Sequence, residues 1–149
     1  MVQAVQVNLK KLNEGAIVPS YGTDYAAGAD LYACMEAPID IESGQTVMIK
    51  TGISMELPEG YAGLIYARSG LATKKGLAPA NKVGVVDSDY RGEIMVSLHN
   101  HSGVTRTVEP GERIAQMVIT PYIRGLFNVV DELSDTERGS GGFGSTGRK

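Results

Sequence analysis

The chain alternates apolar and polar residues in many short runs, and turn residues separate these runs. Residues 5–9, 61–67 and 94–99 alternate with a period of two, which is the pattern of a half-buried strand. Turn signals, mostly glycine and proline, recur roughly every 8–12 residues, which is the spacing of a β-sandwich or barrel. The pattern therefore predicts an all-β fold.

Other apolar segments bounded by turn residues are also expected to be strands, at 39–41, 46–50, 53–57, 104–108 and 114–119. A single short helix is expected from Ser69 to Lys75, because Gly76 is a helix stop signal. The chain has no repeat and no interdomain linker, so residues 1–131 are expected to form one all-β domain. Residues 132–149 are expected to form a flexible, glycine-rich C-terminal arm or lid.

The composition narrows the classes of function. The 14 basic and 17 acidic side chains give a net charge of −3, so any phosphate binding must come from local groups and no nucleic-acid partner is indicated. The single cysteine, Cys34, excludes an internal disulfide and suits a reducing compartment, and we interpret it as a small apolar side chain rather than a catalytic thiol. Residues 1–7 lack the pattern of a signal peptide, and no run approaches the ~18 apolar residues of a membrane span. We therefore expect a soluble, intracellular protein with no membrane partner.

The stretch 84–94 carries the first candidate chemistry. Apolar residues lead into a polar turn at 87–89, and a second strand begins at 94, which predicts a β-hairpin. Aspartate and glycine are ordinary turn residues there, but a bare turn needs neither the ring of Tyr90 nor the guanidinium of Arg91. Taken alone, the stretch is either a plain surface hairpin or a site that carries an acid, a tyrosine and an arginine at its tip.

Two further stretches suit metal or phosphate chemistry. In 27–33, small residues let the backbone approach a ligand closely, and Asp30 is a candidate for holding metal-bound water; a tight turn into a strand is the alternative. In 67–72, Arg68 offers a fork for phosphate oxygens, and Ser69-Gly70 opens the short helix, where free N–H groups bind anions. An ordinary serine N-cap explains the same residues equally well.

Two weaker candidates complete the set. The amide of Gln116, in 111–116, is able to bond a phosphate oxygen or to close a buried polar network. The tail 138–149 is rich in glycine, which predicts a disordered end. Phe143 among these glycines also suits a lid, in which a ring covers a base while backbone N–H groups and hydroxyls wrap a phosphate chain.

In this order, the five stretches resemble the five motifs of the homotrimeric dUTP pyrophosphatases (dUTPases), at residues 27–33, 67–72, 81–94, 111–116 and 138–147. The match spans nearly the whole chain, although Ala67 stands where many members have proline. The resemblance implies a jelly-roll-like β-barrel or sandwich with one short helix, assembled as a homotrimer with a C-terminal arm and with active sites at subunit interfaces. It also implies Mg²⁺-assisted hydrolysis of dUTP to dUMP and pyrophosphate, which limits uracil in DNA and supplies dUMP for thymidylate synthesis.

The resemblance also implies a role for each residue. Asp87 is expected to activate the water that attacks the α-phosphorus, Tyr90 to stack under the deoxyribose, and Asp30 to contact water on a Mg²⁺ ion chelated by the triphosphate. The residues implied to bind substrate are Arg68, Ser69, Gly70, Asn81, Gly84, Val86, Tyr90, Met95, Gln116, Arg138, Phe143, Gly144, Ser145 and Thr146. Two alternatives remain, a dCTP deaminase of the same fold and a non-catalytic nucleotide-binding module. The Asp87 loop and the Phe143 lid favour the pyrophosphatase.

Overall fold

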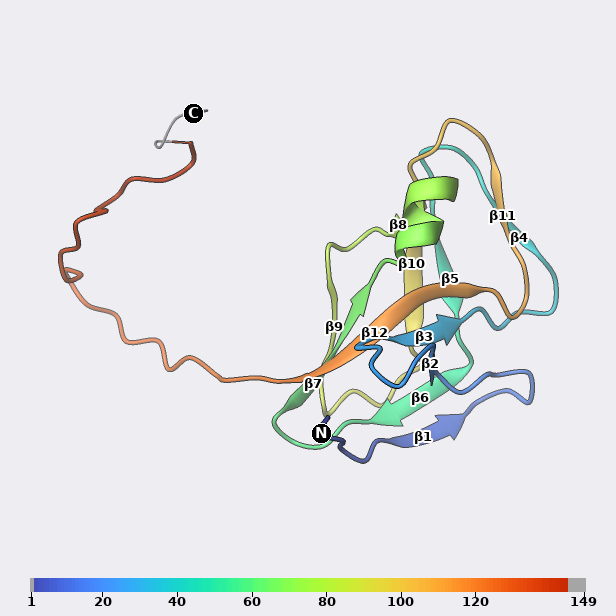
Figure 1. The fold of residues 1–149 in the computed structure, drawn as a ribbon, viewed down its shortest axis with the longest axis horizontal. Helices are drawn as coiled ribbons and strands as arrows, with labels where there is room; N and C mark the ends of the chain where they lie inside the picture. Colours follow the sequence, from blue (N-terminus) through green and yellow to red (C-terminus); the bar gives the residue numbers. More distant parts are fainter. Residues whose placement is uncertain (1, 145–149) are drawn as a thin grey trace.

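The computed structural model of the protein describes residues 2–144 and is all-β with one short helix, which confirms the predicted fold class (Figure 1). The strands are β1 Asn8–Lys11, β2 Ser20–Tyr21, β3 Ala29–Tyr32, β4 Ile39–Ile41, β5 Thr46–Lys50, β6 Ile53–Glu56, β7 Tyr61–Tyr66, β8 Leu77–Pro79, β9 Gly84–Val86, β10 Met95–Asn100, β11 Arg106–Val108 and β12 Arg113–Pro121. The helix, η1, spans Leu71–Lys75 and precedes β8.

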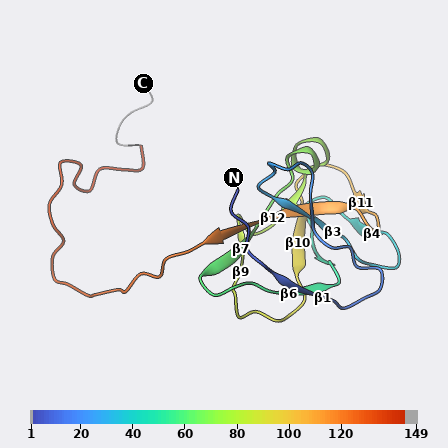
Figure 2. The same ribbon diagram turned by 60° about the horizontal axis from the view of Figure 1, so that its bottom comes forward.

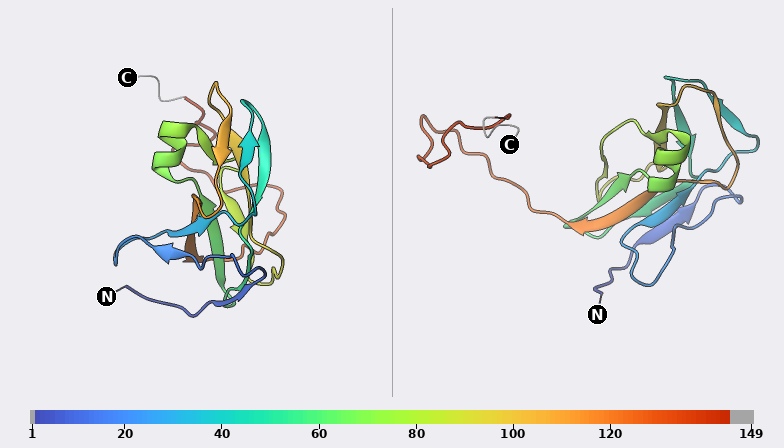
Figure 3. Two further views of the ribbon diagram at one scale, coloured as in Figure 1. Left: turned by 90° about the vertical axis from the view of Figure 1, so that its right-hand side faces the viewer. Right: turned by 45° about the horizontal axis from the view of Figure 1, so that its top comes forward.

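All the strand pairs are antiparallel, and they form two sheets and two short ribbons (Figures 1 and 3). The larger sheet has the order β2-β3-β12-β7-β9 and the smaller one the order β5-β10-β8, while β1 pairs with β6 and β4 with β11. Most neighbouring strands are distant in sequence, because the chain crosses between the sheets as it does in a jelly roll. Figure 2 shows the long β12 passing through the body before the chain leaves it.

The core lies between these layers and follows the alternation of the strands. In β10, Val96, Leu98 and Asn100 point inward and are buried, while the residues between them are more exposed. Asn100 is fully buried, yet its Nδ2 donates to the carbonyl oxygens of Ile41 and Val104, both at 2.8 Å. A buried amide with these partners does not carry the cost of an unsatisfied polar group.

The helix ends where the sequence predicts but begins differently. Ser69 and Gly70 form an α-helical turn, Leu71–Lys75 continues as a π-helix, and Gly76 closes it with a φ of 70°, a left-handed conformation that glycine adopts without strain. The helix start has no side-chain cap, so Ser69 is not the N-cap that the sequence suggested. The first helical bond instead runs from the Ala72 N–H to the Arg68 carbonyl at 2.9 Å.

The predicted hairpin at 84–94 is wrong. β9 pairs with β7, whereas β10 pairs with β5 and β8, so the two strands belong to different sheets and residues 87–94 form a loop between them. Alternation indicates which side chains of a strand face the core, but it does not identify the neighbouring strand.

The chain beyond β12 has no regular secondary structure in residues 122–144 and extends away from the body (Figure 1, orange to red). Its last backbone bond to the body runs from the Tyr122 N–H to the Gly60 carbonyl at 3.0 Å. It carries large apolar side chains that are almost fully exposed, namely Ile123, Leu126, Phe127, Val129 and Leu133. The predicted boundary between domain and arm, at 131–132, remains a prediction.

Candidate active site

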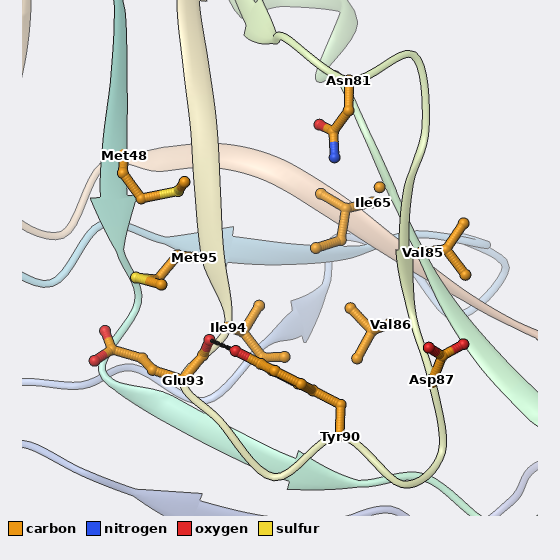
Figure 4. Close-up of a pocket in the computed structure, with 11 residues that line it drawn as sticks. Met48, Ile65, Asn81, Val85, Val86, Asp87, Tyr90, Glu93, Ile94 and Met95 are labelled. Carbon is orange, nitrogen blue, oxygen red and sulfur yellow. Dashed lines mark hydrogen bonds between the residues drawn. The ribbon is translucent and has the colours of Figure 1, made fainter.

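The separation of β9 from β10 opens a pocket of about 230 Å³ between the two sheets (Figure 4). Its lining includes six of the residues that the sequence predicted for catalysis or substrate binding: Asn81, Gly84, Val86, Asp87, Tyr90 and Met95. The other lining residues are Met48, Ile65, Val85, Glu93 and Ile94. Met48 was not predicted, because it comes from β5, and only the pairing of β5 with β10 brings it to the pocket.

The wall of the pocket formed by β9 combines backbone and amide groups. β9 is the edge strand of its sheet, so one side of its backbone has no partner strand to bond. In Figure 4 the amide of Asn81 points into the pocket beside this strand. A Cβ at Gly84 would lie 3.0 Å from the Asn81 Nδ2, so glycine leaves the space that this amide occupies. This wall offers fixed donors and acceptors of the kind that orient a small ligand.

The opposite side is formed by the loop 87–94, in which the ring of Tyr90 folds back over the chain. The Tyr90 Oη donates to the Glu93 carbonyl at 2.9 Å, and the Tyr90 N–H donates to the Asp87 carbonyl at 3.2 Å. A Cβ at Gly92 would overlap the phenol ring, so this ring position requires glycine at 92. The loop thus places a partly exposed ring across the mouth of the pocket.

Asp87 lies at the rim of the same pocket and is exposed to solvent. Within the described part of the chain, its carboxylate makes no hydrogen bond, and only its backbone carbonyl is engaged, by Tyr90. A carboxylate with free lone pairs beside a pocket is able to accept a proton from a water molecule. Geometry and solvation thus suit Asp87 to act as a base.

A second cluster joins the stretches 27–33, 67–72 and 111–116, because β12 pairs with both β3 and β7. The Arg68 Nε donates to the Asp30 Oδ1 at 2.9 Å, and the Arg113 Nη1 lies 3.6 Å from the Asp30 Oδ2. The Gln116 Nε2 donates to the Ala67 carbonyl at 2.9 Å, while Gly28 lies so near that a Cβ would overlap the Gln116 amide. The sequence did not single out Arg113, whose approach to Asp30 depends on the pairing of β3 with β12.

Beside this cluster lies a cationic cleft of about 410 Å³. It is lined by Arg68, Gly70, Leu71, Lys74, Lys75, Gly111, Glu112 and Arg113. Four cations face a single acid, and Lys75 lies 3.4 Å from that acid, Glu112. The excess of positive charge suits an anion such as a phosphate group. The cleft and the pocket share no lining residue, so they are two separate hollows of the chain.

Among the described tail residues predicted to bind substrate, Arg138, Phe143 and Gly144 line neither hollow. The Arg138 Nε donates to the Gly141 carbonyl at 2.7 Å, which closes a local turn, and Phe143 is fully exposed with a φ of 49°. The predicted roles of Arg138, Phe143 and Gly144 remain predictions, and Ser145 and Thr146 lie outside the described residues.

No cluster of three or more histidine, cysteine, aspartate or glutamate side chains suitable for a metal occurs within residues 2–144. Asp30 is the one predicted metal-associated residue, and its ion pairs leave carboxylate lone pairs that are able to accept bonds from water. Among the same residues, no helix is long and apolar enough to span a bilayer.

Comparison with known proteins gives one consistent result. The family model described as dUTPase matches residues 14–147. The chain is 49% identical to the deoxyuridine 5'-triphosphate nucleotidohydrolase of Acinetobacter baylyi, over 97% of this chain and 99% of that protein. It is 45% identical to the protein of the same name from Hahella chejuensis, over the full length of both. Its structure is similar to that of the Staphylococcus bacteriophage 80alpha dUTPase with dUpNHpp, with a TM-score of 0.88 and 28% identity over 97% of this chain and 99% of that one.

Proposed function

The chain belongs to the dUTPase family, and from this membership we propose that it is a dUTP diphosphatase, which hydrolyses dUTP to dUMP and pyrophosphate. The observation that carries this proposal is the pocket between β9 and β10, which has a base-sized volume, an edge-strand wall, and Asp87 and Tyr90 on its rim. The reaction removes dUTP, which limits uracil in DNA, and yields dUMP for thymidylate synthesis. Acting on a DNA precursor, the enzyme works inside the cell.

The size of the pocket supports recognition of the base rather than of the whole nucleotide. At about 230 Å³ it is smaller than the ~300 Å³ at which sites for drug-sized ligands begin. Uracil bonded to the β9 backbone and to Asn81 fits in such a space and leaves room for part of the sugar. Cytosine presents an amine where uracil presents a carbonyl. A buried donor of the wall would then face another donor and be left without an acceptor, and this mismatch carries the larger part of the selectivity. The methyl group of thymine is excluded by contact with the wall.

The sugar and the α-phosphate then lie on the loop 87–94. The ring of Tyr90 supports the deoxyribose and leaves no room for a 2′-hydroxyl group. Asp87 orients a water molecule and accepts its proton as the oxygen attacks the α-phosphorus, and pyrophosphate leaves in line with the attack. Positioning and charge stabilisation provide most of the acceleration, and a general base adds about 10²–10⁴-fold.

The phosphates are held by the cationic cleft of another subunit in a homotrimer. Two observations support this arrangement: the cleft shares no residue with the pocket, and the chain beyond β12 leaves its own body with large apolar side chains exposed. Arg68 and Gly70, which line the cleft, contact the phosphate oxygens together with Ser69 and Gln116, which lie outside its lining. The tail closes over the nucleotide, with Phe143 on the base and Arg138 near the phosphates.

The residues present fit a Mg²⁺ ion carried by the substrate. Magnesium is commonly bound by substrate phosphates with one or two carboxylates, often through water, and Asp30 beside the cationic cleft supplies such a carboxylate. When bound, the ion neutralises phosphate charge and holds the triphosphate in one conformation.

Pyrophosphate release from dUTP, measured beside dCTP, dTTP and UTP with and without Mg²⁺, tests this function. We expect turnover of dUTP alone and a strong dependence on the metal. Ammonia release from dCTP would indicate the deaminase instead. Tight binding of dUTP without turnover would indicate a nucleotide-binding module.

A further inference from the structure

Arg91 ties the loop 87–94 to the body of the protein, although it does not line the pocket. Its Nη1 donates to two carbonyl oxygens of the turn, that of Ser88 at 2.7 Å and that of Tyr90 at 3.2 Å. Its Nη2 donates to the Glu56 Oε1, on β6, at 3.1 Å. One planar guanidinium therefore joins two loop carbonyls to a carboxylate on a neighbouring strand.

Glu56 is in turn oriented from β1. Glu56 and Asn8 are cross-strand partners in the β1–β6 ribbon, and the Asn8 Nδ2 donates to the Glu56 Oε2 at 2.9 Å. Each carboxylate oxygen of Glu56 therefore has its own donor, which defines the plane of the carboxylate. The hydrogen bond from Asn8 and then the charge of Arg91 lower the pKa of Glu56, so the carboxylate stays charged at neutral pH.

The other hydrogen bonds of the turn do not reach the body. Among residues 88–91, the bonds of Tyr90 to Asp87 and to Glu93 stay within the loop, and only the bond from Arg91 to Glu56 leaves it. The far end of the loop is anchored separately, by the Gly52 N–H on the Glu93 Oε2 at 3.2 Å and by the Ile94 N–H on the Ile53 carbonyl at 2.8 Å. Between β9 and these anchors, residues 88–91, which include Tyr90, have Arg91 as their only hydrogen-bonded link to the described part of the body.

We propose that Arg91 is a positioning residue: its fork, oriented by Glu56 and Asn8, holds the turn so that Asp87 and Tyr90 face the pocket. The roles of Asp87 and Tyr90 rest on the proposed function, whereas the attachment of the loop does not. The side chains of Arg91 and Glu56 are 55% and 53% exposed, so their ion pair contributes little to global stability. The ion pair instead keeps the loop ordered. This order matters because a small displacement of a reacting group lowers the rate by a large factor.

The fork distinguishes this role from a purely electrostatic one. Lysine keeps the charge but is a compact point donor, and it cannot reproduce a planar group bonded in two directions. If Arg91 acted through its charge on Asp87, then Arg91→Lys would restore activity, and Arg91→Ala would move the acidic limb of the pH profile of kcat. Positioning predicts a lower plateau with that limb unmoved.

The experiment compares Arg91→Ala, Arg91→Lys and Glu56→Gln with a matched control, Glu59→Gln. Glu59 lines the same surface cleft as Glu56 and Arg91, but it makes no bond to Arg91. Hydrogen exchange of the peptide covering 87–93 is followed without nucleotide, and kcat and KM are measured with dUTP. We expect faster exchange and a kcat about tenfold lower in Arg91→Ala. Arg91→Lys should recover only part of the loss, Glu56→Gln should lose less than Arg91→Ala, and Glu59→Gln should match the wild type.

Three results would overturn the proposal: unchanged loop exchange and kcat in Arg91→Ala, full recovery in Arg91→Lys, or a large fall in thermal stability with normal kcat per folded molecule. If Arg91→Ala fails to fold, Arg91→Lys and Glu56→Gln decide the matter by the same two measurements. A wild-type protein that does not hydrolyse dUTP would remove the proposed function, while the exchange data would still decide whether Arg91 orders the loop.

Discussion

The guanidinium of Arg68 lies against the carboxylate of Asp30, with the Nε 2.9 Å from the Oδ1. The two side chains are largely shielded from solvent, at 28% and 14% exposure, and Arg113 approaches the second carboxylate oxygen. Asp30 therefore organises two of the cations beside the cleft before any substrate arrives. This arrangement reduces the ordering that a bound triphosphate would otherwise require.

Replacement of Asp30 by asparagine should weaken both the cleft and the fold. Two cations lose their partner, so we expect the free energy of unfolding to fall by about 1–3 kcal/mol. The KM for dUTP should rise about tenfold or more, because the phosphate-binding groups are no longer held in place. Thermal unfolding and steady-state kinetics measure the two effects, with the exposed Asp40→Asn as control. A KM equal to that of the wild type would show that the ion pair is only structural.

Asp87→Asn should lower kcat by two orders of magnitude or more and leave the fold and the affinity for dUTP unchanged, because only the proton acceptor is lost. Asp89→Asn, two residues further along the same exposed turn, is the matched control and should keep normal turnover. Pyrophosphate release measures kcat, and the binding of a non-hydrolysable analogue measures the affinity for the nucleotide. Near-normal turnover in Asp87→Asn would place the base elsewhere.

Tyr90→Ala should admit UTP, because the ring that blocks a 2′-hydroxyl group is gone, and binding should weaken overall. Gly92→Ala should have the same effect although it keeps the tyrosine, because the added Cβ would displace the phenol group. The ratio of kcat/KM for dUTP to that for UTP measures the change. Gly103→Ala, where a Cβ meets open space, is the control. Strict exclusion of UTP in both variants would mean that Tyr90 is not the gate for the sugar.

Acid should weaken the contact of Glu56 with Arg91 and Asn8. The pKa of Glu56 is lowered in the fold, first by the hydrogen bond from Asn8 and then by the charge of Arg91. Its stabilising effect is therefore present above the ordinary glutamate pKa of about 4.3 and is lost as the pH falls through the lower, folded value. We expect wild type to be slightly more stable than Glu56→Gln at about pH 7, and we expect this difference to be smaller at about pH 3. Thermal unfolding at both pH values tests this, and a difference that grows in acid would contradict it.

Deletion of residues 138–149 should nearly abolish hydrolysis and leave thermal stability unchanged. In the described part of this segment, up to residue 144, the hydrogen bonds are local, and Phe143 contributes nothing to the core. Ordering the tail over a nucleotide costs roughly 1–2 kcal/mol for each residue fixed, which contacts to the ligand must offset.

A mixing experiment shows where the tail acts. If it closes the site of another subunit, truncated chains mixed with Asp87→Asn chains should regain part of the activity. Full activity in the truncated protein alone would show that the tail is not a lid. A large loss of thermal stability would show that the tail instead stabilises the fold.

The local features of this protein follow from its sequence alone. Alternation located β7, and an apolar segment between turn residues located β5, each with the bounds that the structure shows to within a residue, because both patterns need only the side chains of one strand. Gly76 marked the end of the helix, because a left-handed residue there needs no information from the rest of the fold. The glycine-rich tail likewise indicated a segment that cannot form a core.

The choice of neighbouring strands, and with it the shape of the site, depends on the fold as a whole. The sequence placed β9 and β10 in one hairpin, whereas their assignment to two sheets opens the pocket between them. The contacts of Arg113 with Asp30 and of Arg91 with Glu56 join residues far apart in the chain, and no local pattern encodes such pairs. They arise because burying the apolar faces of all the strands together selects one set of strand partners, and that selection belongs to the whole fold.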